Sequence, residues 1–213
     1  TVGAALPILE SIARSVNSGD DIARVDAVLS GTLNYIFSTY KGGEDGKTFA
    51  DVVRQAQEAG YSEPDPRLDL SGRDVLRKLL ILSREAGAAI DEADVEIDPI
   101  LGPEFFSGKV PAFYEMLAAN ESSFAASYRA AADKGLRQRF VASLVAVQEE
   151  GGVHYKASMG LQCVGPENPL FNLCGTDNAA LIKTSFYPSP LVVQGAGAGA
   201  YQTASGVLND ILL

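Results

Sequence analysis

The sequence predicts an α+β fold, with helices packed on a mixed, largely antiparallel sheet. Helical spacing of apolar residues dominates the chain up to Ala132, whereas short apolar segments separated by Gly, Pro and Asn turns fill most of it from Leu136 onward. Helices grouped before strands favour this class over a repeating βαβ order. With 213 residues and 46% hydrophobic composition, the chain can bury the core of one large domain, taken as residues 1–213.

The individual elements follow from apolar spacing and from residues that begin or end helices. Four helices carry such start signals, among them a proline and two Ser/Thr-x-x-Asp capping patterns. They begin at Pro7, Ser30, Thr48 and Ser71, and alanine-rich helical stretches follow around residues 116–117 and 124–132. One early extended segment and four later ones are expected as strands, at Ile22–Leu29, Phe140–Val147, Val153–Cys163, Ala179–Phe186 and Leu191–Val193.

Charge and cysteine content narrow the class of partner. The formal net charge is -10 and no basic cluster occurs, which argues against nucleic acid or an anionic membrane. No apolar run approaches the roughly 20 residues that span a bilayer. The sparse cysteines, Cys163 and Cys174, fit a reducing cytoplasm, where buried apolar thiols are the default expectation. A small-molecule or protein partner is therefore expected. The start at Thr1, without an initiating Met, suggests an excised piece of a longer protein.

The candidate functional side chains are most concentrated between Gly60 and Lys78. Four carboxylates occur there within a dozen residues, and two prolines bias Glu63 and Asp65 toward extended backbone. Asp74 and Lys78 are four residues apart, so they share one face of a helix. The alternative is an ordinary exposed ion pair that follows a polar turn. Because the chain has a single histidine, His154, any catalysis would fall to Lys, Asp and Glu.

The run from Gly60 to Leu82 resembles the signature of homoserine dehydrogenases: Gly-Tyr-x-Glu-Pro-Asp-Pro-Arg, then Asp-Leu-Ser-Gly, then a helix with Asp and Lys. The resemblance continues through residues 1–7, 29–37, 175–178 and 195–199, while residues 88–138 look somewhat like enzymes fused to an aspartate kinase. It implies a cytoplasmic enzyme whose chain is the catalytic and dimerisation domain. One departure is Leu68, where the family usually has an acidic residue.

That resemblance assigns roles to several side chains. Lys78 would exchange the proton at the reacting oxygen, and Asp74 would orient Lys78 and bind substrate. Glu63 would bind the substrate's amino group. Further substrate contacts are implied at Tyr61, Asp69, Gly31 and Thr32. Carboxylates for an ammonium and donors for a carboxylate are what a zwitterionic amino acid requires.

The glycine run near the end allows two interpretations. Gly195-x-Gly197-x-x-Ala200 mimics a dinucleotide fingerprint, but too little chain follows for a complete βαβ unit. A close helix-strand packing turn is the alternative. The resemblance implies that Gly199 contacts NADP or NAD, whose Rossmann domain is absent from this chain and expected upstream of Thr1. The chain alone would then lack turnover.

The resemblance also implies a cation and a subunit partner. Backbone carbonyls of Val2, Ala4 and Leu6 would bind a monovalent cation such as sodium, together with a glutamate upstream of Thr1. The family's habit and the strand-rich second half suggest a homodimer. The implied reaction interconverts L-aspartate 4-semialdehyde and L-homoserine, in the synthesis of threonine, methionine and isoleucine. The alternative is a noncatalytic amino-acid-binding or dimerisation module, which has no need for Lys78.

Overall fold

The computed structural model describes residues 2–150 and 152–212, so Thr1 and Leu213, the ends of the expected domain, lie outside the described residues. The α-helices are α1 (Ile8–Asn17), α2 (Gly31–Thr39), α3 (Phe49–Glu58), α4 (Arg67–Leu70), α5 (Arg73–Glu85), α6 (Val110–Ala119), α7 (Glu121–Ala132) and α8 (Ala200–Leu212). Short 3-10 helices are η1 (Glu92–Asp94), η2 (Pro103–Phe106) and η3 (Pro169–Asn172). The strands are β1 (Ile22–Val28), β2 (Val95–Ile97), β3 (Arg137–Glu149), β4 (Gly152–Val164), β5 (Asp177–Thr184) and β6 (Leu191–Ala196).

The strands form one sheet in the order β2-β4-β3-β1-β5-β6. The pair β2 and β4 is parallel, and the other neighbouring strands are antiparallel. This confirms the predicted α+β class with a mixed, largely antiparallel sheet. Strand β1 lies in the middle of the sheet between β3 and β5, so a segment from the helical first half completes the core of the strand-rich second half.

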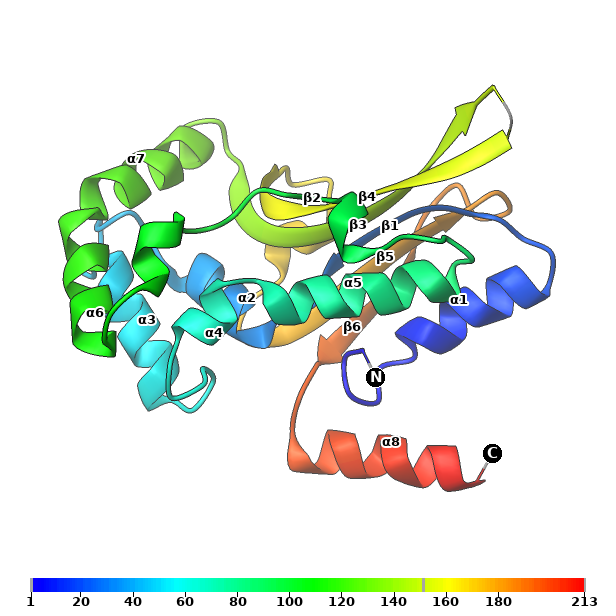
Figure 1. The fold of residues 1–213 in the computed structure, drawn as a ribbon, viewed down its shortest axis with the longest axis horizontal. Coiled ribbons are helices and arrows are strands. Elements are labelled where there is room, and N and C mark those ends of the chain that lie inside the picture. The colour runs from blue at the N-terminus through cyan, green and yellow to red at the C-terminus, as the bar shows by residue number, and fades with distance from the viewer. Residues whose placement is uncertain (1, 151, 213) are drawn as a thin grey trace.

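Helices cover the sheet and extend beyond one end of it. In Figure 1, α1 and α5 lie along the sheet, while α3, α6 and α7 gather at one end and α8 lies apart from the main body near the N-terminus. Helix α5 buries Val75, Leu79 and Leu82 against the core. Because Asp74 and Lys78 lie on another face of α5, this packing leaves both groups outside the core. Within the described residues, no helix is long and apolar enough to cross a membrane.

The structure confirms one of the two predicted Ser/Thr-x-x-Asp capping patterns and contradicts the other. Helix α3 begins with the expected box: Asp51 N donates to Thr48 Oγ1 at 3.1 Å, and Thr48 N donates to Asp51 Oδ2 at 3.0 Å. The expected box at Ser71 and Asp74 is wrong. Helix α5 starts after Gly72, whose φ of +69° is the left-handed conformation, and a Cβ there would lie 3.0 Å from Met159 Cε. Close packing on the sheet thus sets this helix start.

Other sequence expectations were incomplete or wrong. Strand β2 and helix α8 were not expected, so the simple order of helices followed by strands does not hold. Strand β2 is only three residues long, too short to show alternation. Helix α8 buries no residue among those described, so it lacks a clear apolar face toward the core. Cys163, near the end of β4, and Cys174, in the loop before β5, are exposed rather than buried as expected.

Candidate active site

A cavity of about 400 Å³ lies between the start of α2, the loop before α4, helix α5 and the turn after β6. Seven of the residues expected from the sequence line it: Gly31, Thr32, Tyr61, Asp69, Asp74, Lys78 and Gly199. Ser30, Gly60, Thr176, Asn178, Gly197 and Ala198 complete the lining. The structure therefore brings together segments separated by more than 150 residues, and it places the predicted catalytic pair beside the predicted cofactor-contact glycine.

The lysine of this cavity is held by two oxygen atoms. Lys78 Nζ lies 2.7 Å from Asp74 Oδ2 and donates to the carbonyl of Leu29 at 2.8 Å. Leu29 directly follows β1, so the end of the central strand positions the ammonium. The Lys78 side chain is 20% exposed and that of Asp74 is 64% exposed. An ammonium has three N–H donors, so one remains for a group bound in the cavity.

Asp69 organises the loop that forms one side of the cavity. Its Oδ1 lies 3.1 Å from Thr32 Oγ1, and its Oδ2 accepts from Ser62 Oγ and Glu63 N at 3.0 Å each. Thr32 Oγ1 also donates to the carbonyl of Tyr61. Hydrogen bonds to a carboxylate are among the stronger ones in proteins. Asp69 therefore ties the first turn of α2 to residues 61–63, in addition to lining the cavity.

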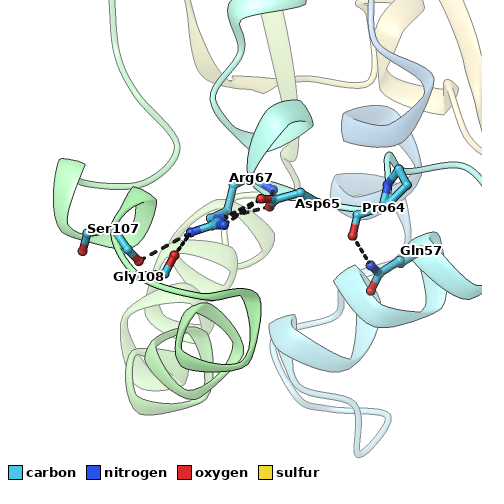
Figure 2. Close-up of polar contacts among 6 residues, drawn as sticks. All are labelled: Gln57, Pro64, Asp65, Arg67, Ser107 and Gly108. Carbon is cyan, nitrogen blue, oxygen red and sulfur yellow. Dashed lines mark hydrogen bonds and ion pairs between the residues drawn. The ribbon is translucent and has the colours of Figure 1, made fainter.

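An ion pair on the outer side fixes the same loop (Figure 2). Arg67 contacts both carboxylate oxygens of Asp65, with Nη2 to Oδ2 at 2.6 Å and Nε to Oδ1 at 2.9 Å, and its Nη1 donates to Gly108 O at 2.9 Å. Hydrogen bonding from Arg67 lowers the pKa of Asp65 below its usual range. Gln57 Nε2 donates to Pro64 O at 2.7 Å. The loop is thus anchored to α3 and to the segment before α6.

Two of the expected substrate contacts lie toward the outside. Tyr61 is 47% exposed and its ring centroid lies 5.0 Å from that of Tyr35. Glu63 is exposed and is not among the residues that line the cavity, although its backbone N–H binds Asp69. Asp69 thus holds the Glu63 backbone beside the cavity wall, while the Glu63 side chain does not line the cavity.

The opposite side of the cavity is built from glycines that allow close approach. A Cβ at Gly31 would lie 2.7 Å from the carbonyl oxygen of Thr176, and one at Gly197 would lie 2.2 Å from Asn178 Cγ. Gly199 has a φ of +135°, which side chains rarely adopt. The roles of Thr176 and Asn178 were missed, although Gly175–Asn178 belongs to the resembling sequence. A polar pair directly before a buried strand was the available signal.

The expected cation turn lies next to this cavity. Residues 2–6 form a tight turn in which Gly3 and Ala4 have φ values of +72° and +53°, and Leu6 N donates to Gly3 O at 3.0 Å. Val2, Ala4 and Leu6 line a cleft of about 770 Å³ that Asp74 and Lys78 also line. The Leu6 carbonyl accepts from Ile8 N at 2.7 Å. In the described part of the chain no cluster of three His, Cys, Asp or Glu side chains suits a metal.

Comparison with known proteins identifies relatives. The family model described as homoserine dehydrogenase matches residues 7–212. The chain is 40% identical to an Arabidopsis thaliana bifunctional aspartokinase/homoserine dehydrogenase, covering 100% of this chain and 22% of that protein. It is 38% identical to the homoserine dehydrogenase of Emericella nidulans, covering 100% of this chain and 58% of that protein. The chain therefore spans well under two thirds of these relatives.

A solved structure supports the same relationship. A hyperthermophilic archaeal homoserine dehydrogenase in complex with NADPH superposes with a TM-score of 0.67 at 27% identity, covering 100% of this chain and 53% of that one. The family match extends over α1 to α8 and includes Tyr61 to Lys78 and the glycine turn before α8. The chain belongs to the homoserine dehydrogenase family.

Proposed function

We propose that the chain supplies the substrate-binding and catalytic part of an NAD(P)-dependent homoserine dehydrogenase, which interconverts L-aspartate 4-semialdehyde and L-homoserine. This places it in the synthesis of threonine, methionine and isoleucine. The observation that carries the proposal is the Lys78 ammonium, held by Asp74 and the Leu29 carbonyl in the cavity that Gly197 and Gly199 also line. A proton donor and the glycine turn thus line the same cavity.

Lys78 performs the proton transfer of the reaction. A bound nicotinamide cofactor would supply the hydride, and the C4 carbonyl oxygen of the semialdehyde would then carry negative charge. Lys78 Nζ donates a proton to that oxygen, which gives the hydroxyl of homoserine, and in the reverse direction it accepts that proton. Asp74 orients the ammonium through their 2.7 Å contact. Leu29 O restricts the direction in which the ammonium points.

The polar loop binds the rest of the amino acid. The proposal places the substrate ammonium near the Glu63 and Asp69 carboxylates, and the substrate carboxylate near the first turn of α2, at Gly31 and Thr32. Thr32 lies in the first turn of a helix, where free N–H groups and the helix dipole favour an anion. Charge pairing at both ends would hold C4 at a fixed distance from Lys78.

The cofactor's nicotinamide end would be held by residues of this chain, at Gly197 to Gly199. These residues line the same cavity as Lys78, and their glycines pack closely, because Cβ atoms at Gly197 and Gly199 would lie 2.2 Å from Asn178 and 2.1 Å from Gln202. The ribose and phosphates would be bound by residues outside these 213. In support, the described sheet has one parallel strand pair, and a dinucleotide fold requires consecutive βαβ units.

A monovalent cation and a second subunit complete the proposal. The backbone carbonyls of Val2, Ala4 and Leu6 would bind a cation such as sodium, next to the cleft shared with Lys78. A homodimer would cover apolar side chains on β6 and α8, including Val192, which is 49% exposed. Light scattering at micromolar concentration tests the dimer, and a monomeric mass would contradict it.

Homoserine-dependent reduction of NADP or NAD by the enzyme that contains this chain tests the function. Turnover that requires homoserine is the expected result. The rival hypothesis is a noncatalytic amino-acid-binding or dimerisation module. It predicts homoserine binding by calorimetry with no reduction of either nucleotide.

A further inference from the structure

Asn178 has a buried amide for which the described chain offers no complete set of partners. The residue begins the buried part of β5 and is 1% exposed, yet it lines the cavity. Among residues 2–150 and 152–212, its Oδ1 has no hydrogen-bond partner. Buried polar atoms without partners are rare because each loses hydrogen bonding to water on folding. An unpaired amide at a cavity wall points to a ligand.

The surrounding chain is shaped around this amide. Across the sheet, Asn178 pairs with Gly195, and a Cβ at Gly197 would lie 2.2 Å from both Cγ and Nδ2 of Asn178. The glycine turn therefore passes directly over the side chain. Below it, Asn34 Nδ2 lies within 3.3 Å of the carbonyls of Cys174, Gly175 and Asp177, which fixes the segment leading to Asn178. The amide is thus held at the side of the cavity formed by Gly197–Gly199.

The chemistry of an amide selects the ligand group. An asparagine side chain offers a donor and an acceptor in one plane, so a carboxylate would pair only with Nδ2 and an ammonium only with Oδ1. A second amide satisfies both atoms. The terminal torsion of Asn is broad, so a modest rotation turns both atoms toward a group in the cavity. We propose that Asn178 binds the carboxamide of the nicotinamide ring and so sets the ring's orientation toward Lys78.

This inference rests on the proposed function, and binding measurements test it separately from turnover. In calorimetric titrations of the enzyme that contains this chain, NADP is compared with its 3-acetylpyridine analogue, which keeps the carbonyl but replaces the amine with a methyl group. Wild-type enzyme should bind the analogue about three- to tenfold more weakly, the size of one lost hydrogen bond. In Asn178→Ala the NADP affinity should fall by about tenfold, and the ratio of the NADP affinity to the analogue affinity should fall to about one.

Gln138→Ala is the control, because Gln138 also carries a buried amide but lies on β3, bonds Ser127 Oγ and is not among the cavity-lining residues. It should keep the wild-type preference. If Asn178→Ala does not fold, Asn178→Ser serves in its place. The inference would be overturned if the preference for NADP over the analogue survived the Asn178 substitution, or if the wild type lacked that preference. It would also be overturned if the substitution changed only the affinity for homoserine. A wild type with the preference but without homoserine-dependent reduction would instead refute the proposed function.

Discussion

The cavity has two walls that are built in different ways. The polar wall, residues 61–78, holds its shape through charged contacts: Asp69 binds three groups, Arg67 pairs with Asp65, and Lys78 pairs with Asp74. The glycine wall, formed by Gly31 and residues 197–199, holds its shape through close approach, with Thr176 and Asn178 packed where side chains would otherwise lie. One wall presents charged groups, and the other presents backbone that packs closely against its neighbours.

This difference implies different responses to substitution. On the polar wall, removal of a charged atom changes binding or proton transfer while the loop keeps other anchors, such as the bond from Gln57 to Pro64. On the glycine wall, any added atom overlaps its neighbour, so the shape itself changes. Substitutions on the polar wall should therefore separate into effects on turnover and on substrate affinity, and those on the glycine wall should alter stability and cofactor affinity together.

The largest effect is expected at Lys78. Lys78→Ala should lower kcat of the enzyme that contains this chain by at least about 100-fold, because general acid catalysis typically contributes that much. Steady-state kinetics measure it, and Arg77→Ala on the exposed side of the same helix should retain near wild-type kcat. Wild-type kcat in Lys78→Ala would remove the basis of the proposed mechanism.

The next effect tests the glycine wall. Gly197→Ala should lower the free energy of unfolding by about 1–3 kcal/mol, because its Cβ would overlap Asn178. The double variant Gly197→Ala/Asn178→Ala removes the three overlapping atoms of Asn178 and should recover most of that loss. Denaturant unfolding measures both. Equal losses in the single and double variants would show that Asn178 is not what limits space at this turn.

The sequence predicted the polar wall better than the glycine wall, for a physical reason. The polar wall could be predicted because the residue types and their spacing are visible in the sequence. Asp74 and Lys78, for example, are four residues apart and so share one face of a helix. The approach of Gly197 to Asn178 depends on β5 and β6 pairing in one register, and nothing in the local sequence specifies which residues face each glycine. The place of Thr176 and Asn178 in the cavity wall was therefore found only from the structure.

The fold shows a similar division. Segments with strong periodicity were predicted within a few residues, as at β3 and α7, whereas the position of β1 in the centre of the sheet required long-range pairing with β3 and β5. The predicted cap at Ser71 failed because packing of Gly72 against Met159 and Phe140 overrides the local signal. Local sequence patterns thus predicted the helices and strands themselves. Tertiary contacts decided the order of the strands in the sheet and where some helices begin.

A smaller effect is expected at the outer end of the polar wall. Glu63→Gln removes the charge proposed to pair with the substrate ammonium and keeps the side-chain shape, so the homoserine KM should rise by about tenfold with kcat less affected. Glu58→Gln, an exposed carboxylate at the end of α3, is the control for overall charge and should leave KM unchanged. An unchanged KM in Glu63→Gln would assign ammonium binding to Asp69 alone.

The smallest effect concerns the ion pair behind the loop. Hydrogen bonds from Arg67 lower the pKa of Asp65 below 3.8, so the carboxylate binds its proton less readily in the folded chain than in the unfolded one. Its contribution to stability is therefore present above the unfolded pKa and is lost as the pH falls through the folded pKa. Asp65→Asn should lower the Tm by about 1–2 °C near pH 7, since ion pairs that remain partly in contact with solvent contribute little. The difference from wild type should shrink as the pH drops below about 4, because the unfolded wild-type carboxylate then takes up a proton that the folded one binds less readily. Thermal unfolding of both proteins between pH 7 and 3 measures this. A difference that stays constant over the whole range would mean that the Asp65 charge does not stabilise the loop, which the bonds from Gln57 to Pro64 and from Arg67 to Gly108 would then hold.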